Sequence, residues 1–377
     1  MKKVGIVTFH DEPNYGAILQ TYALQETIRD LGHSPQIVGY NPTIVPQKWL
    51  QRRLTDAKSI SLKLRIFLEN ILFASKVNRY KKECLAFFQK YYSCADKCGI
   101  SCEELLKNPP DCDVFSVGSD QVWNPYVQCD KVYMLHFAAE HQKRISYGAS
   151  FGVAEIPQEL RTYYQESLAQ FSAVSVRESA ALTLLDSLHI GNSVKPKLVL
   201  DPTLLREPLD WENIISGGDS QTDLPPFPYI LVYAHGKSGS VVRIAEHLKK
   251  KTGNNIVLVG PFRRSFFVRS FSRTYCVGPI GFLQLMKNAR CVVTNTYHGT
   301  IFAYTFRRPF VTFLSPTNKG ASRFHQIFDL WQLRSRLITG IDELPKDFEN
   351  IDFDTAEKNR KAEKERSIAF LKEAIES

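Results

Sequence analysis

The sequence has no long apolar run, because no stretch approaches the roughly 18 apolar residues that a membrane-spanning helix needs. At the N-terminus, Lys2 and Lys3 precede only a short apolar segment, which His10 and Asp11 close. A signal peptide requires a longer apolar segment and a small-residue cleavage site, so we interpret this segment as the first core strand. We therefore expect a cytoplasmic protein.

The sequence also lacks the cysteine pairs of common metal sites. Six of the eight cysteines lie in the N-terminal half: Cys84, Cys94, Cys98, Cys102, Cys112 and Cys129. Three residues separate Cys94 from Cys98 and Cys98 from Cys102, whereas a zinc ribbon uses C-x₂-C pairs and iron–sulfur sites have their own spacings. We expect reduced thiols, as in most cytosolic proteins, and no metal.

Neither G-x-G-x-x-G nor G-x-x-x-x-G-K-[ST] occurs, so the sequence carries no fingerprint of a dinucleotide or P-loop site. Acidic residues are fewer than basic ones, 39 against 48, which leaves a net charge of +9. This charge favours an anionic partner, such as a phosphorylated metabolite, a nucleic acid or an acidic bilayer, without choosing among them. At 377 residues, of which 44% are hydrophobic, the chain is long enough for two domains.

Strand-like and helix-like patterns alternate along both halves of the chain. Residues 1–40 form a β-loop-α-β pattern, and residues 229–314 repeat it several times, as in a doubly wound α/β fold with parallel sheets. The stretch "SGGDSQTDLPPFP" has the composition of a linker. We expect an N-terminal α/β domain over 1–205, a linker over 206–228, a Rossmann-like domain over 229–345 and a C-terminal helix over 346–377 that packs back.

Residues 47–92 are basic and rich in leucine, isoleucine and phenylalanine, and we expect a helical insertion in the N-terminal domain. Its cationic face has two interpretations, a membrane-surface contact or a solvated helix face.

Ligands of open α/β sheets bind beyond the carboxyl ends of the strands, and the polar residues that follow strands are few. Arg177 follows "SAVSV" and needs an anionic partner, which is either Glu178 or Asp201, or a ligand phosphate or carboxylate. His298 follows a strand, and the N-terminus of the next helix favours an anion. Asp120 and Trp123 lie in "GSDQVWN" and have two interpretations. Either the carboxylate and the indole bind a sugar, or Asp120 is a helix N-cap and Trp123 a half-buried ring.

The chain resembles the polysaccharide pyruvyl transferase family over most of its length. The resemblance rests on the order and spacing of "NYGAILQTYAL", "GSDQVWN", "SYGASFG", "VSVRES", "LDPTLL", "TNTYHGTIFA" and "SRF". It implies a GT-B-like pair of Rossmann-type domains with a cleft between them. It also implies transfer of a pyruvyl group from phosphoenolpyruvate to a sugar as a cyclic ketal.

The resemblance places the acceptor on the N-terminal domain and the donor on the C-terminal domain. We expect a hexose acceptor, namely a galactose bridged at its 4- and 6-hydroxyls, in a lipid-linked precursor of a capsular polysaccharide or exopolysaccharide. Peripheral contact with the inner face of the membrane fits such a substrate, whereas no nucleic acid partner and no cofactor are expected.

Two positions depart from the family pattern. Many members have Arg-x-His-Gly where this chain has Thr296-Tyr297-His298-Gly299, and an acid where this chain has Ala17. We expect the Thr296 hydroxyl to donate to phosphate, and either Arg323 or Lys319 supplies the missing cation or the donor differs.

Three groups of site residues follow from these arguments. The catalytic residues are His298 for proton handling, Asp201 to orient the imidazole or stabilise the cationic carbon, and Asp120 as base for the acceptor hydroxyl. The donor residues are Arg177, Thr296, Tyr297, His298, Gly299, Lys319, Arg323 and His235. The acceptor residues are Asn14, Tyr15, Asp120, Trp123, Asn124 and Tyr147, with Trp123 and Tyr15 as sugar platforms.

Two other functions remain open on the sequence, a GT-B glycosyltransferase that uses a nucleotide sugar and a non-catalytic glycan-binding protein. The sequence predicts that His298→Ala and Arg177→Ala each abolish pyruvyl transfer while the fold survives.

Overall fold

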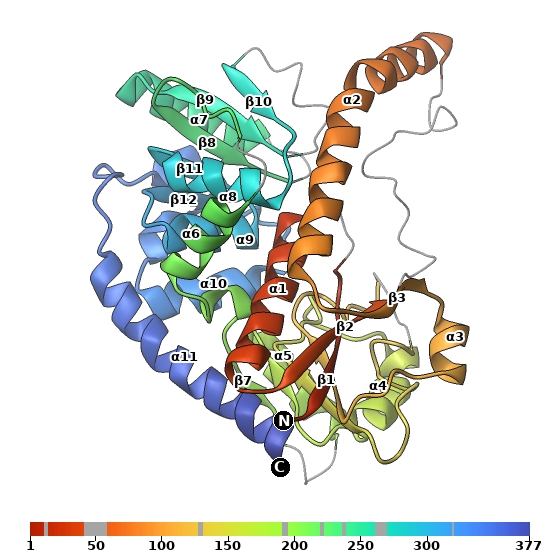
Figure 1. Ribbon diagram of the computed structural model, residues 1–377. Coiled ribbons are helices and arrows are strands. Elements are labelled where there is room, and N and C mark those ends of the chain that lie inside the picture. Colours follow the sequence, from red (N-terminus) through yellow and green to blue (C-terminus); the bar gives the residue numbers. More distant parts are fainter. Residues whose placement is uncertain are drawn as a thin grey trace.

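Two parallel β-sheets, each flanked by helices, form the frame of the molecule (Figure 1). The computed structural model describes residues 1–10, 14–40, 59–126, 131–190, 195–218, 222–235, 239–260, 270–318 and 320–377. The expected α/β architecture with parallel sheets is confirmed.

The first sheet has the order β3-β2-β1-β4-β5, and every pair in it is parallel. Its central strands are short apolar runs, "KVGIV" and "VFSVG", that are buried on both faces as a parallel sheet requires. The elements of this half are β1 (Lys3–Val7), α1 (Tyr15–Asp30), β2 (Ser34–Tyr40), α2 (Ile60–Tyr91), β3 (Cys94–Ile100), α3 (Cys102–Lys107), β4 (Val114–Gly118), β5 (Lys143–Tyr147), α4 (Arg161–Leu168), β6 (Ser175–Val176), α5 (Ser179–Leu188) and β7 (Lys197–Leu198).

The second sheet has the order β10-β9-β8-β11-β12-β13 and is also parallel throughout. Its elements are β8 (Tyr229–Tyr233), α7 (Gly239–Thr252), β9 (Asn255–Val259), β10 (Arg273–Tyr275), α8 (Pro279–Asn288), β11 (Cys291–Thr294), α9 (Tyr297–Thr305), β12 (Phe310–Phe313), α10 (Ala321–Trp331) and β13 (Leu337–Ile338). In both sheets the strand order reverses beside the first strand, between β1 and β4 and between β8 and β11. Such switch points are where open α/β sheets bind ligands.

The stretch expected to be a linker contains a helix. Within 206–228, α6 (Pro208–Gly217) begins with a capping box in which the Glu207 backbone N–H donates to the Asp210 carboxylate. Trp211 of α6 is buried and packs edge-on against Phe302 of α9. The connection is therefore packed into the core that the two sheets share.

Helix α2 belongs to the region expected to be a helical insertion, whereas residues 41–58 lie outside the described residues. Its C-terminal half is buried through Val77, Tyr80 and Phe87. Figure 1 shows the N-terminal half of α2 extending away from both sheets. Over the described ranges, no helix is long and apolar enough to cross a membrane.

The cysteines of the N-terminal half do not form one group in space. Cys84 packs in the core shared by the two sheets, whereas Cys112 belongs to a separate cluster beside the first sheet. Burial raises the pKa of Cys112 to about 11, so its thiol stays protonated at neutral pH.

Helix α11 (Phe353–Glu376) runs across both halves of the molecule (Figure 1). Near its start, Asn359 donates to the Leu330 carbonyl of α10, and near its end, the Lys2 ammonium donates to the Ile375 carbonyl. The last helix therefore ties the second sheet to the first.

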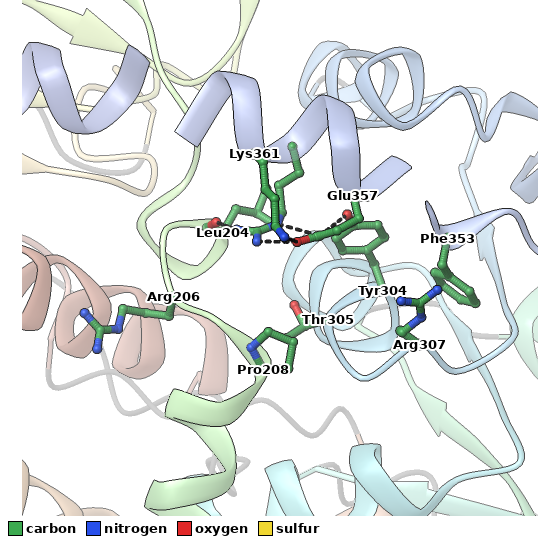
Figure 2. A pocket seen from close by; sticks show the side chains of 10 residues that line it. Leu204, Arg206, Pro208, Tyr304, Thr305, Arg307, Phe353, Glu357 and Lys361 are labelled. Carbon is green, nitrogen blue, oxygen red and sulfur yellow. Dashed lines mark hydrogen bonds and ion pairs between the residues drawn. The ribbon is translucent and has the colours of Figure 1, made fainter. Parts of the chain in front are cut away.

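The central contact of α11 is made by Arg360, which is almost fully buried. Its guanidinium donates to the Leu204 carbonyl at 2.6 Å, to Glu207 at 2.8 Å and to Glu357 at 2.7 Å. Arg360, Leu204 and Glu357 border a cavity of about 200 Å³ that Tyr304 of α9 also lines (Figure 2). Arg360 therefore joins α11 to the segment that connects the two sheets.

Arg360→Met is expected to lower the free energy of unfolding by roughly 2–4 kcal/mol, because it leaves the buried Leu204 carbonyl without its donor and removes one donor from each of Glu207 and Glu357. Arg366→Met is the matched control, since Arg366 lies on the same helix and its side chain is 75% exposed in its pair with Glu363. Urea unfolding of both variants measures the difference. Equal stability of the two variants would contradict a clamping role for Arg360.

A candidate active site between the two sheets

Polar residues that follow strands of both halves, including the separate two-stranded sheet of β6 and β7, meet between the two large sheets. From the first half come Asp120 after β4, Arg177 after β6 and Asp201 after β7. From the second half come His298, in the first turn of α9, and Arg323, in the first turn of α10. His298 lies 3.4 Å from Asp201, and Arg177 and Arg323 both lie against the ring of Tyr297.

Arg177 is the centre of the charge cluster. Its guanidinium donates to Asp201 at 2.9 Å and to Asp120 at 3.3 Å, and its Nε lies 3.6 Å from Glu178. The side chain is completely buried. Burial opposes its charge, but the three carboxylates outweigh that cost and raise the pKa of Arg177 above its usual value.

This environment corrects the prediction that Arg177 binds the donor. Three carboxylates already surround its guanidinium, so it is a structural counterion of the site rather than a cation available to a ligand. The expectation that the fold survives Arg177→Ala is also not supported, since breaking a buried ion pair costs about 3–5 kcal/mol.

Asp201 connects Arg177 to His298. One carboxylate oxygen accepts from Arg177 and from Ser119, and lies 3.4 Å from the His298 Nε2. The other oxygen accepts from the backbone N–H and the hydroxyl of Thr203. Although burial opposes ionisation, His298 and Arg177 hold the pKa of Asp201 well below its usual range, so it remains a carboxylate.

Gly16 fixes the other side of the His298 imidazole. It lies in the first turn of α1, whose N-cap Asn14 accepts a hydrogen bond from the Gly16 backbone N–H at 3.0 Å. A Cβ atom at position 16 would overlap the imidazole at Nδ1. Two elements of the first half, α1 and the segment after β7, therefore hold a histidine of the second half between them.

Arg323 differs from Arg177 in having no hydrogen-bond or ion-pair partner among the described residues. The two guanidinium groups lie 5.4 and 4.9 Å from the centre of the Tyr297 ring. Burial and the nearby positive charge of Arg177 lower the pKa of Arg323. An anion bound at Arg323 would relieve both effects, so this side chain is the candidate anion site.

His235, another predicted donor residue, lies at the end of β8 near this group. Burial, together with Arg323 and His298, lowers the pKa of His235 to about 4. Its Nε2 lies 3.1 Å from the Tyr233 hydroxyl. His235 is therefore neutral near pH 7 and adds no positive charge to the anion site.

Thr296 corrects a second donor prediction. Its Oγ1 caps α9 by accepting from the Gly299 N–H at 3.0 Å, and it lies 2.9 Å from the Thr294 Oγ1. The Thr294 hydroxyl proton goes to the Tyr233 carbonyl, so the single Thr296 proton goes to Thr294 and none is left for a phosphate. Gly299 serves the same cap, because a Cβ there would overlap both threonine hydroxyls.

Three predicted acceptor residues are core residues instead. Trp123 is fully buried, and its indole N–H donates to the Tyr133 carbonyl. Tyr15 is stacked on Phe282 and donates to the Val277 carbonyl, and Tyr147 donates to the Leu200 carbonyl. The prediction of Trp123 and Tyr15 as sugar platforms is wrong for this reason, since neither ring presents a face to a ligand.

Asn124, a predicted acceptor residue, and Arg323, a predicted donor residue, lie at an opening between the two halves. This opening, of about 310 Å³, is lined by Asn124 of the first half and Arg323 of the second. Asp120, four residues before Asn124, has a left-handed backbone (φ 68°) that its hydrogen bonds with Arg177 and with the Gln121 N–H hold in place. Lys319 lies outside the described residues.

Residues 148–152 also match G-x-S-x-G, the pattern of a hydrolase nucleophile elbow. Ser150 is fully buried here, and its hydroxyl donates to Glu178 at 2.6 Å and accepts from the Gly152 N–H. The serine therefore supports Glu178 beside Arg177 and is not an exposed nucleophile.

Sequence reasoning missed two kinds of residue. Gly16 has no side chain, and the only signal for it is a glycine directly after a predicted N-cap. Gln121 and Tyr126 line the opening, whereas the sequence predicts their neighbours Asp120 and Trp123 as ligand-binding residues. Since "GSDQVWNPY" is not a regular strand or helix, no periodicity indicates which of its side chains faces outward.

Comparison with known proteins identifies one sequence family and one fold. The sequence model of the polysaccharide pyruvyl transferase family matches residues 14–316. No curated protein matches the sequence.

Among solved structures, UDP-GlcNAc 2-epimerase from Methanocaldococcus jannaschii has a TM-score of 0.52 at 14% identity, over 95% of this chain and 91% of that one. A putative UDP-N-acetylglucosamine 2-epimerase from Listeria monocytogenes has a TM-score of 0.52 at 10% identity, over 96% and 90%. The enzyme from Rickettsia bellii has a TM-score of 0.51 at 9% identity, over 98% and 96%. At such identities the likeness shows the fold alone, which is GT-B-like, as expected.

Gly16→Ala is expected to displace the His298 imidazole from Asp201, because the new methyl group overlaps the ring. Overpacking of this kind costs about 1–3 kcal/mol. The measurement is the imidazole NMR signal of His298, assigned by its loss in His298→Gln, together with thermal unfolding. Gly217→Ala is the control, since its Cβ would meet only the Tyr91 hydroxyl at 3.6 Å. An unchanged His298 signal in Gly16→Ala would contradict the contact.

Proposed function

The chain belongs to the polysaccharide pyruvyl transferase family, and we propose that it transfers the pyruvyl group of phosphoenolpyruvate to a hexose of a capsular polysaccharide or exopolysaccharide precursor. The proposed acceptor is galactose, the product its 4,6-linked pyruvate ketal, and the second product inorganic phosphate. Family membership supports pyruvyl transfer onto a polysaccharide.

The observation that carries the proposed donor is the guanidinium of Arg323, which has no hydrogen-bond or ion-pair partner among the described residues and lies against Tyr297, the residue before His298. Phosphoenolpyruvate carries a phosphate and a carboxylate, and guanidinium binds either group through charge-assisted hydrogen bonds. Arg177 is enclosed by carboxylates, and Thr296 has no proton to donate. Arg323 is therefore our choice for the cation that replaces the arginine missing at position 296.

His298 is the proposed group for proton handling at the donor. Ketal formation requires a proton on the methylene carbon, which becomes the methyl group, and positive charge then develops at C2. Imidazole suits this task near neutral pH, and the Asp201 carboxylate 3.4 Å from Nε2 orients the ring. The other carboxylates of the cluster favour the developing cation electrostatically.

Asp120 is the proposed base for the acceptor. Two sugar hydroxyls add to C2 and lose their protons, while the C–O bond to phosphate breaks and phosphate leaves. The net change converts phosphoenolpyruvate and the diol into the ketal and inorganic phosphate: of the two hydroxyl protons lost, one balances the proton gained by the methylene carbon and the other leaves with phosphate, and no water is released. Asp120 lies within the cluster, where it accepts a hydrogen bond from Arg177 at 3.3 Å, and its carboxylate is the proposed acceptor of a proton from a closely held hydroxyl.

A lipid-linked acceptor would bring the protein to the inner face of the cell membrane, and we propose a cytoplasmic protein with peripheral membrane contact. The support is α2, on which Ile60, Leu64 and Phe67 are exposed at helical spacing. Basic residues outnumber acidic ones over 47–92, which suits an anionic bilayer.

Incubation of the protein with phosphoenolpyruvate and a galactose-terminated oligosaccharide is expected to release phosphate and add one pyruvyl group to the sugar, as followed by mass spectrometry. Arg323→Met is expected to raise KM for phosphoenolpyruvate about 10- to 100-fold, because it removes charge-assisted hydrogen bonds. His298→Gln is expected to lower kcat about 10²- to 10⁴-fold. Arg366→Met, an exposed arginine far along α11, is the charge-matched control.

Three results would count against this function. Turnover that requires a nucleotide sugar would select a glycosyltransferase, and saccharide binding without turnover would select a glycan-binding protein. Near-normal kinetics of both Arg323→Met and His298→Gln would remove the proposed site.

Vesicles test the membrane contact separately. The protein is expected to co-sediment with phosphatidylserine-containing vesicles at low salt, and the triple variant Ile60→Ser, Leu64→Ser, Phe67→Ser is expected to remain in the supernatant. Leu106→Ser and Leu209→Ser, both exposed elsewhere, form the control. Equal sedimentation of the triple variant and the wild type would contradict a role for α2.

A further inference from the structure

The opening between the two halves has a second group of residues besides the anion site. Gln121, Asn124 and Tyr126 line it from the loop after β4, and Asn318 lines it together with Arg323 from the second half. Its volume of about 310 Å³ is that of a small-ligand site. The opening therefore has room beside Arg323 for more than the donor anion alone.

Apart from Arg323, the residues that line the opening are uncharged. Tyr126 is 68% exposed, and it is one of only two aromatic residues, with Phe67, among the exposed large hydrophobic side chains of the described residues. An exposed aromatic ring among amides is the composition expected for an uncharged, hydroxyl-rich ligand, because the ring packs on C–H groups while the amides bond to hydroxyls.

The loop that holds Tyr126 is fixed by hydrogen bonds of its own. The Asn124 amide donates to the Gln121 Oε1 at 2.8 Å, and its oxygen accepts from the Tyr126 backbone N–H at 3.0 Å. Both polar ends of Asn124 are therefore used within the loop. Since Oε1 of Gln121 is occupied, its side-chain NH₂ remains a donor with no partner among the described residues.

A matching donor lies on the second half. The Asn318 side-chain oxygen accepts from the Gly320 backbone N–H at 2.9 Å, which leaves its NH₂ as a donor at the opening. The two amide donors thus come from opposite halves of the molecule. A ligand that accepts hydrogen bonds from both would bridge the opening.

Gly152 keeps Gln121 in position. Its backbone is left-handed (φ 63°), and a Cβ at this residue would overlap the Gln121 side-chain amide. The Gly152 N–H donates to Ser150, whose hydroxyl binds Glu178 beside Arg177. The loops of the opening are therefore anchored to the charge cluster, and the Gln121 backbone N–H donates directly to Asp120 at 2.8 Å.

We propose that this opening is a saccharide subsite that takes an uncharged pyranose ring, with Tyr126 packed on the ring and Gln121 and Asn318 donating to its hydroxyls. Its identification as the acceptor subsite rests on the proposed function, in which Asp120 accepts the hydroxyl proton and Arg323 holds the donor. Arg323 is the only charged residue among those that line the opening, and in the proposed function the donor anion occupies it. The lining then offers no charged group to an amino or carboxylate substituent of the sugar, so the subsite selects neutral hexoses.

The first experiment measures binding to the full-length protein in the absence of phosphoenolpyruvate. Methyl β-galactopyranoside, methyl glucopyranoside and methyl mannopyranoside are probed by saturation-transfer NMR, with glucosamine as a cationic comparison. At least one neutral pyranoside is expected to bind, and glucosamine is expected to bind more weakly. Failure of all three neutral pyranosides to bind would overturn the subsite.

The second experiment uses variants. Tyr126→Ala is expected to weaken pyranoside binding about three- to tenfold, whereas Tyr126→Phe retains the ring and the affinity. Gln121→Met keeps the side-chain length but removes the amide donor, and it is also expected to weaken binding. Leu209→Ala, an exposed residue of α6, is the control. None of these variants is expected to change the affinity for phosphoenolpyruvate more than twofold, and circular dichroism checks the fold.

The outcomes separate the subsite from the proposed function. Pyranoside binding that depends on Tyr126, without any pyruvyl transfer, upholds the subsite and overturns the function. Pyruvyl transfer with an acceptor KM that Tyr126→Ala changes less than twofold upholds the function and overturns the subsite. Equal loss of phosphoenolpyruvate and pyranoside binding in Tyr126→Ala would also overturn it, since that pattern indicates a general structural role.

Discussion

The buried charge of Arg177 is the constraint on which the rest of the site depends. A guanidinium with no exposure to water requires anionic partners, and Asp120, Asp201 and Glu178 provide them from three different segments of the first half. His298 and the arginine in turn hold the pKa of Asp201 well below its usual range, so Asp201 stays ionised. The loops after β4, β6 and β7 are therefore held in one arrangement by electrostatics as much as by packing.

This arrangement separates the two arginines that the sequence offers as anion binders. Arg177 forms ion pairs with three carboxylates. Arg323 lies against the Tyr297 ring and forms no ion pair among the described residues. Both guanidinium groups lie against the same ring, one as the charge that builds the site and the other as the charge that is available to a ligand. Residue type alone does not distinguish these roles, but the partners do.

The site is complete only when the two halves are in contact. His298 belongs to the second half, yet Asp201 and Gly16 of the first half determine where its imidazole lies. The same interface contains Tyr15 stacked on Phe282 and is spanned by α11 with the buried Arg360. A change in the relative position of the two sheets would therefore alter the environment of His298 before it altered either sheet.

The sequence by itself determined the parallel α/β halves, the strand ends at which Asp120, Arg177, Asp201 and His298 occur, and the family. Strand and helix periodicities are local, so a single sequence displays them. Only the tertiary structure decided that Arg177 is neutralised, that the Thr296 proton is used by Thr294, and that Trp123 is buried while Tyr126 is exposed. Those outcomes depend on which side chains are buried together. In the buried interior, charges pair and hydrogen bonds form between residues up to hundreds of positions apart in the sequence.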